Sequence, residues 1–296
     1  MSVIKKINVN NVSYEIGNSS PTTMSNIEVQ NDDSVSDLNI GDENGNVIAQ
    51  FKEGHIVTKN FDSRENTNQG SGVVNFPHQL DNLKVIIVGD SITVGQGLSN
   101  PSTERWGNRL AEKYNWDLIL DAAGGIPLAT NSTNRTSIVT KLESKLKSIE
   151  NPDLIIIWGG HNDSSYQSTP FGEFNTRDKT TFCGVIEYIA DICKKYAPNA
   201  RVFILTLIYA TDSRDSTYMV LSPDKTVRDM DNAIRIGAER NGMFLVDMSK
   251  CGINYVNGVS GNMTIDSVHP NVKGTNQIVA YLSRVLEREY VKYVSE

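Results

Sequence analysis

The chain has 296 residues, a formal net charge of −7 and 39% hydrophobic residues, which is enough to bury a sizeable core in one or two domains. The acidic balance argues against a nucleic-acid-binding surface and against a basic membrane-binding face. The N-terminus lacks the apolar stretch of a signal peptide, and no apolar run reaches the roughly 18 residues that a transmembrane helix needs. We therefore expect no membrane insertion and, by default, a cytoplasmic location.

Residues 1–80 are rich in Asn, Ser, Asp and Gly and show no helical periodicity. Asn44-Gly45 is a strong signal for a type I′ hairpin turn. The polar segment 62–75 is typical of a linker. Short stretches of alternating apolar and polar residues predict strands at 7–16, 38–40 and 47–51. The sequence thus predicts a small β-rich region and a linker over residues 1–80.

From residue 81 the pattern changes to short, continuous apolar runs, which are typical of parallel strands covered on both faces. These runs lie at 85–88, 118–120, 154–158, 202–208 and 244–246. Between and after them, apolar residues recur at helical spacing over 182–193, 227–234 and 278–286. Strands that alternate with helices predict one α/β domain with a central parallel sheet over residues 81–296.

The three cysteines, Cys183, Cys193 and Cys251, are an odd number without a CxxC pair. This pattern argues against a disulfide framework and against a zinc site, and it predicts buried free thiols. No HExxH or other metal-ligand spacing occurs, so we expect chemistry without a metal or a cofactor.

Glycines and polar residues stand where ligands bind in such a sheet, at the carboxyl ends of strands. They occur in four short segments, Gly89-Asp90-Ser91, Gly124-Gly125, Gly160-His161-Asn162-Asp163 and Asp266-Ser-Val-His269. A serine hydroxyl becomes a nucleophile when a histidine held by a carboxylate takes its proton. Asp266 and His269 are three residues apart, so one turn of chain can place both on one face. Glycine N–H groups and an asparagine amide can stabilise the oxyanion of acyl transfer.

These four segments, in this order and at these elements, resemble the four sequence blocks of the SGNH (GDSL-type) serine hydrolases. The resemblance covers residues ~81–290, following the element count. It implies a three-layer α/β/α, flavodoxin-like fold with a central, mostly parallel five-stranded sheet. Asp121 stands where the family often has Asn, which affects the alignment of the second block only.

The resemblance also implies the roles of individual residues. It implies a catalytic triad of Ser91, His269 and Asp266. It implies three oxyanion donors, namely the N–H of Ser91, the N–H of Gly125 (with Gly124 as the alternative) and the amide of Asn162. Plain structural roles remain as alternatives, since Ser91 could be a helix N-cap and Asp266 a charge beside a helix.

Substrate choice is expected to come from loops at the same edge of the sheet. The segments 164–181 and 209–224 are mostly polar, and their scattered aromatic residues include Phe171 and Phe174. A polar rim with aromatic faces suits a sugar, although these aromatic residues could instead pin the loops to the core. The residues expected to line the pocket are Gly124, His161, Tyr166 and Tyr209.

The expected function is therefore that of a serine esterase that removes a short acyl group, with acetyl on a carbohydrate as the favoured substrate. A thioesterase, peptidase or lysophospholipase-type acylhydrolase is an alternative, because the same site serves any activated acyl group. A non-catalytic carbohydrate-binding appendage is another.

The segment 37–61 resembles short β segments of phage tail and fibre proteins. It suggests an attachment module, or a homo-oligomer formed through residues 1–80. A small β extension covering the enzyme is an equal alternative. A phage-like particle released by lysis would place the protein outside the cell without a signal peptide.

Overall fold

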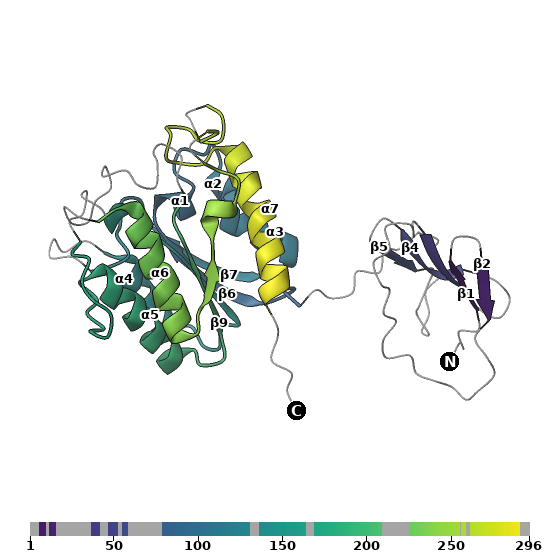
Figure 1. The fold of residues 1–296 in the computed structure, drawn as a ribbon, viewed down its shortest axis with the longest axis horizontal. Coiled ribbons are helices and arrows are strands. Elements are labelled where there is room, and N and C mark those ends of the chain that lie inside the picture. The colour runs from purple at the N-terminus through teal and green to yellow at the C-terminus, as the bar shows by residue number, and fades with distance from the viewer. Residues whose placement is uncertain are drawn as a thin grey trace. The chain divides into compact units, whose positions relative to one another are not determined.

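The computed structural model describes five strands within residues 6–58, and residues 79–290 apart from 131–135, 164–168, 209–224, 255 and 259–260. The chain divides into two compact units, Met1–Pro77 and His78–Glu296, both of which are drawn in Figure 1. The predicted linker 62–75 and the Asn44-Gly45 turn lie outside the described residues.

The first unit contains a five-stranded antiparallel sheet with the strand order β2-β1-β3-β4-β5. Its strands are β1 Lys6–Val9, β2 Val12–Glu15, β3 Asp37–Gly41, β4 Val47–Lys52 and β5 His55–Thr58. Leu38 of β3 pairs with Phe51 of β4, as expected for the two arms of the predicted hairpin. The alternating stretch 7–16 forms most of two strands, β1 and β2.

The second unit is built on a five-stranded sheet in which every neighbouring pair is parallel. Its strands are β6 Lys84–Gly89, β7 Asp117–Ala122, β8 Leu154–Trp158, β9 Arg201–Leu205 and β10 Phe244–Val246. The order β10-β9-β8-β6-β7 is flavodoxin-like, and the chain reverses direction across the sheet between β6 and β8. All five predicted strands are therefore confirmed, and the carboxyl ends of β6 and β8 border the crevice where such sheets bind ligands.

Helices cover both faces of this sheet (Figure 1). They are α1 Ser91–Val94, α2 Pro101–Glu104, α3 Trp106–Tyr114, α4 Ile138–Ser148, α5 Phe182–Tyr196, α6 Val227–Asn241 and α7 Val272–Glu289. Short 3-10 helices span His161–Asp163 and Met248–Lys250. Helices α5, α6 and α7 confirm the three predicted helical segments, and α3 and α4 were not predicted.

Alternate residues of β6 feed two separate hydrophobic cores. Ile86 and Val88 pack with α4, α5 and α6 on one face of the sheet. Val85 and Ile87 pack with α3 and α7 on the other face. Because side chains alternate along a strand and both faces are covered, the strand is apolar at every position from 85 to 88.

The three cysteines are free and buried, as predicted. Burial raises the pKa of the Cys183 thiol to about 11 and that of Cys193 to about 12, so these thiols are inert at neutral pH. Among the described residues, no helix is both long and apolar enough to cross a membrane.

Candidate active site

Ser91 is placed by the sharp turn that joins β6 to α1. It is the first residue of α1, and the side chain of the preceding residue, Asp90, caps this helix by accepting from the N–H of Ile92 at 3.0 Å. The N-cap is therefore Asp90, so the alternative in which Ser91 itself caps the helix does not hold. Its side chain lies at the carboxyl end of the sheet.

Asp266 and His269 lie in a tight turn before α7, which places both side chains on one face, as their spacing allows. The N–H of Ile265 donates to the carbonyl of His269 across 2.8 Å, and Ser267 has a left-handed φ of 69°. Oδ1 of Asp266 accepts from the backbone N–H groups of Val268 and His269 at 3.1 and 2.8 Å. One carboxylate oxygen thus stabilises the turn, and the other is left for the imidazole ring.

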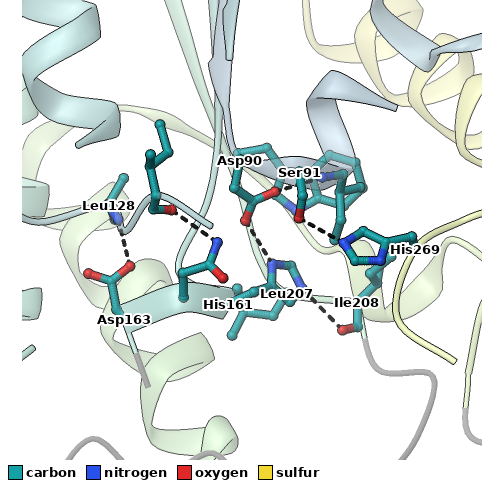
Figure 2. Close-up of polar contacts among 12 residues, drawn as sticks. Asp90, Ser91, Leu128, His161, Asp163, Leu207, Ile208 and His269 are labelled. Carbon is teal, nitrogen blue, oxygen red and sulfur yellow. Dashed lines mark hydrogen bonds and ion pairs between the residues drawn. The ribbon is translucent and has the colours of Figure 1, made fainter. Parts of the chain in front are cut away.

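A continuous chain of hydrogen bonds links these three side chains. Nδ1 of His269 lies 2.7 Å from Oδ2 of Asp266, and Nε2 lies 2.9 Å from Oγ of Ser91; the second of these contacts is drawn in Figure 2. Partial burial raises the pKa of Asp266, but hydrogen bonds from the backbone and ring of His269 outweigh it and hold the pKa below its ordinary value. The ionised carboxylate can only accept, so Nδ1 carries the proton and Nε2 can take the proton of Ser91.

Asn162 and the two glycines also come to this edge of the sheet. Nδ2 of Asn162 donates to the carbonyl of Ile126 at 3.0 Å, which orients the amide and leaves its second hydrogen for another acceptor. A Cβ added to Gly124 would lie 3.9 Å from Cβ of Ser91, so the backbone passes close to the serine here. Gly125 has a φ of 72°, a conformation that favours glycine. The two glycines remain alternatives for a backbone donor.

Asp163 fixes the loop that carries these glycines. Its carboxylate accepts from the N–H groups of Leu128 and Ala129 at 2.6 and 3.0 Å, and Figure 2 shows the first of these contacts. Complete burial raises the pKa of Asp163 to about 7, although these backbone hydrogen bonds oppose the shift. The glycine loop after β7 and the asparagine turn after β8 are thereby held together.

His161, which the sequence suggested as a pocket-lining residue, is largely buried beside Asp90 and Ile208. Its side chain is 11% exposed, and Nδ1 lies 3.4 Å from Oδ2 of Asp90. Its Nε2 lies 3.3 Å from the carbonyl oxygen of Ile208. Sequence analysis assigned no partner to His161, because Asp90 precedes it by 71 positions and only the strand order brings the two together.

The expected aromatic rim is only partly described. Phe171 and Phe174 pack against the core on the α5–α6 side, and Phe171 stacks on Phe182 with ring centroids 6.3 Å apart. These contacts favour the alternative interpretation, in which the two residues pin their loop. Tyr166 and Tyr209 lie outside the described residues.

Asp121, which departs from the family pattern, pairs with two lysines of α4. Its carboxylate oxygens lie 2.5 Å from Nζ of Lys141 and 3.3 Å from Nζ of Lys145. The charge at this position is therefore compensated on the side of the sheet that α4 covers, and it does not disturb the histidine and the serine.

Residues 87–276, well over half of the chain, match the sequence profile of a family described as the GDSL-like Lipase/Acylhydrolase family. The match begins at residue 87, and none of the comparisons supports the expected resemblance of residues 37–61 to phage tail and fibre proteins. The comparison with curated proteins found no match.

Several solved structures share the fold of the second unit. A protein from Lactobacillus plantarum is 19% identical with a TM-score of 0.59, and the match covers 71% of this chain and 99% of that one. A possible lipase from Chitinophaga pinensis is 18% identical with a TM-score of 0.51, covering 70% and 98%. A member of the lipolytic protein G-D-S-L family from Veillonella parvula is 17% identical with a TM-score of 0.50, covering 69% and 98%. At these identities the likeness is one of fold.

Proposed function

The chain belongs to the GDSL-like lipase/acylhydrolase family, and from that premise we propose that it is a serine esterase that hydrolyses short-chain acyl esters. The observation that carries the proposal is the hydrogen-bonded chain from Asp266 through His269 to Ser91, with contacts of 2.7 and 2.9 Å. A serine hydroxyl within reach of an imidazole, itself oriented by a carboxylate, is the arrangement that nucleophilic acyl transfer requires.

The proposed reaction has two steps. In the first, Oγ of Ser91 attacks the ester carbonyl while Nε2 of His269 takes the hydroxyl proton, and the C–O bond to the alcohol then breaks as His269 returns the proton to the leaving oxygen. In the second, a water molecule gives a proton to His269 and attacks the acyl-serine ester, which releases the acid and restores the hydroxyl of Ser91. Asp266 keeps the imidazole in the required tautomer throughout.

The negative charge on the tetrahedral intermediate needs donors that are already in place. We assign this role to the N–H of Ser91, the amide of Asn162 and the N–H of Gly125, with Gly124 as the alternative. Support comes from the orientation of Asn162 by Ile126 and from the closeness of Gly124 to Ser91.

For the substrate, we propose an acetyl or similarly short ester of a carbohydrate. The support is the polar composition of segments 164–181 and 209–224, since polar groups around a cleft select a hydroxylated alcohol. Phe171 and Phe174 add nothing to this argument, because they pack on the core.

A longer or more apolar acyl group, as in a lysophospholipase-type enzyme, is the second candidate. Large apolar side chains are exposed along the segment that carries the catalytic histidine. They are Val256, Ile265, Val268 and Val272, with exposed fractions of 84%, 37%, 44% and 42%. Such exposed side chains beside a reactive centre can contact an apolar substrate.

The test is hydrolysis of p-nitrophenyl esters from acetate to long chains by the wild type and by Ser91→Ala. We expect the wild type to favour acetate and Ser91→Ala to lose about 10⁴-fold or more in kcat. Ser148→Ala is the matched control, because Ser148 is an exposed serine near the C-terminus of α4.

Each other outcome selects an alternative. Faster turnover of long chains would favour the lysophospholipase-type reaction, and faster turnover of a thioester would favour a thioesterase. Equal activity of the wild type and Ser91→Ala would exclude Ser91 as the nucleophile, and carbohydrate affinity would then test the appendage hypothesis.

A further inference from the structure

Asp90 and His161 form a buried pair directly beside two residues of the proposed machinery. Asp90 precedes Ser91 and is 2% exposed, and His161 precedes Asn162 and is 11% exposed. They stand at the carboxyl ends of β6 and β8, the strands that border the crevice. The contact between them, 3.4 Å from Nδ1 to Oδ2, therefore joins the turn after β6 to the turn after β8 (Figure 2).

Each ring nitrogen of His161 faces an oxygen atom that can accept a hydrogen bond. Nδ1 faces the carboxylate of Asp90, and Nε2 faces the carbonyl of Ile208 at 3.3 Å. A neutral ring has one N–H and one lone pair, so it would point the lone pair at one of these oxygens. The imidazolium carries an N–H on each nitrogen, so it can donate from Nε2 to the carbonyl of Ile208 and form an ion pair through Nδ1 with Asp90, and this arrangement favours the charged form.

The charges around the ring agree with this assignment. Burial lowers the pKa of His161, but the hydrogen bond and charge of Asp90, the carbonyl of Ile208 and the charge of Asp231 on α6 outweigh it, and the net shift is upward. Asp163, in the same 3-10 turn, directs its carboxylate to Leu128 and Ala129.

We propose that His161 is a positioning residue, which as an imidazolium ties the turn of Ser91 to the turn of Asn162 and to the segment after β9. It thereby sets the distance between the nucleophile and the oxyanion donor. This inference rests on the proposed function. His161 itself contacts only protein groups, Asp90 and Ile208, and acts through its neighbours.

The first test is the protonation of the ring by ¹⁵N NMR at about pH 7.5, near the ordinary range of histidine titration. The chain has four histidines, so the signal missing from His161→Phe identifies the residue. We expect both nitrogens to be protonated in the wild type and a neutral ring in Asp90→Asn, whose amide can donate to Nδ1. A neutral ring in the wild type would overturn the proposal, and this outcome does not depend on esterase activity.

The second test is kinetic. We expect His161→Phe to lower kcat by about 10- to 100-fold with KM changed less than about 3-fold, because a displaced oxyanion donor weakens transition-state binding more than substrate binding. The kcat of the wild type should also fall at alkaline pH as His161 loses its proton. This alkaline limb should be absent from His161→Phe and from Asp90→Asn.

The matched control is Tyr114→Phe, which removes a part-buried hydroxyl that donates to Glu287 at 2.5 Å. Tyr114 is the last residue of α3 and lies at the edge of the sheet opposite to the carboxyl ends of the strands. It should keep the kcat and the pH profile of the wild type. A wild-type kcat and alkaline limb in His161→Phe would overturn the proposal. If His161→Phe does not fold, Asp90→Asn is the deciding variant. A charged His161 ring together with the alkaline fall in kcat of the wild type, both observed in Asp90→Asn, would then overturn the proposal. Loss of activity in all proteins, with a charged ring in the wild type, would count against the proposed function alone.

Discussion

At the scale of single residues, three aspartates organise the site by accepting hydrogen bonds from the backbone, and two of them also face a histidine. Asp266 holds its own turn with one oxygen and His269 with the other. Asp90 accepts from Ile92 and faces His161, and Asp163 holds two N–H groups of the glycine loop. Each carboxylate thus fixes a turn that carries a residue of the proposed machinery, which is the rigid support that preorganised catalysis needs.

The role of Asn162 can be tested at this scale. Asn162→Ala should lower kcat by about 10²- to 10³-fold and change KM little, since an oxyanion donor acts mainly in the transition state. Steady-state kinetics with p-nitrophenyl acetate would give both constants. An increase in KM at constant kcat would instead make Asn162 a substrate-binding residue.

At the scale of elements, the catalytic turn depends on the start of α7. Asn271 caps this helix by accepting from the N–H of Gly274 at 3.0 Å, and its Nδ2 donates to the carbonyl of Asn262 at 2.8 Å. The same side chain therefore anchors the helix and the segment that leads into the turn of Asp266 and His269.

Asn271→Ala and Thr226→Ala form a matched pair for this dependence. Thr226 caps α6 through a capping box with Asp229, so each change should cost about 1 kcal/mol, or roughly 2–4 °C in Tm. Only Asn271→Ala should also lower kcat, by about 10-fold, because the base would lose its fixed position. Equal kcat values in the two variants, measured at 25 °C, would show that the turn holds without its cap.

The elements also show what can be predicted from sequence. The five strands could be placed because each contains a continuous apolar run. Ser91 and Asn162 could be found because each follows such a strand, and Asp266 and His269 because they precede the last amphipathic helix. Residue spacing could not tell a helical turn from the tight turn at 266–269, which depends on a left-handed Ser267. Nor could it show the contact between Asp90 and His161, because that contact follows from strand order.

At the scale of the whole molecule, Asp163 should make stability depend on pH. Its pKa is about 7 in the folded protein, against an ordinary value of 3.8 for an exposed aspartate, so between these pH values the folded state keeps a proton that the unfolded state releases. The free energy of unfolding should therefore fall as pH rises from 4 to 7, by roughly 4 kcal/mol from this group, and stay level above pH 7.

Asp163→Asn removes this titration but leaves one N–H of the glycine loop without its acceptor, so it should be less stable than the wild type at pH 4. Urea unfolding from pH 4 to 8 would measure both proteins. The advantage of the wild type should shrink as pH rises. A constant difference would mean that Asp163 stays ionised in the folded protein.

The two units can be tested separately. Both hydrophobic cores of the described chain are formed by residues from Leu80 onward, so a chain of residues 78–296 should fold and keep the kcat of the full protein on p-nitrophenyl acetate. If residues 1–80 form a homo-oligomer, sedimentation should show the full chain as an oligomer and the shortened chain as a monomer. If the full chain and the shortened chain are both monomers, the attachment module and the small β extension remain as the alternatives for residues 1–80.

The hydrogen bond between Ser91 and His269 joins residues 178 positions apart, and the histidine lies just before α7. On the ribosome, the nucleophile would leave the exit tunnel long before its base is synthesised. A nascent or truncated chain could collapse around β6 and β8 and still have no esterase activity. Under the proposed function, esterase turnover would therefore report that a chain extends past His269 and has folded. It could serve as a selection for such chains.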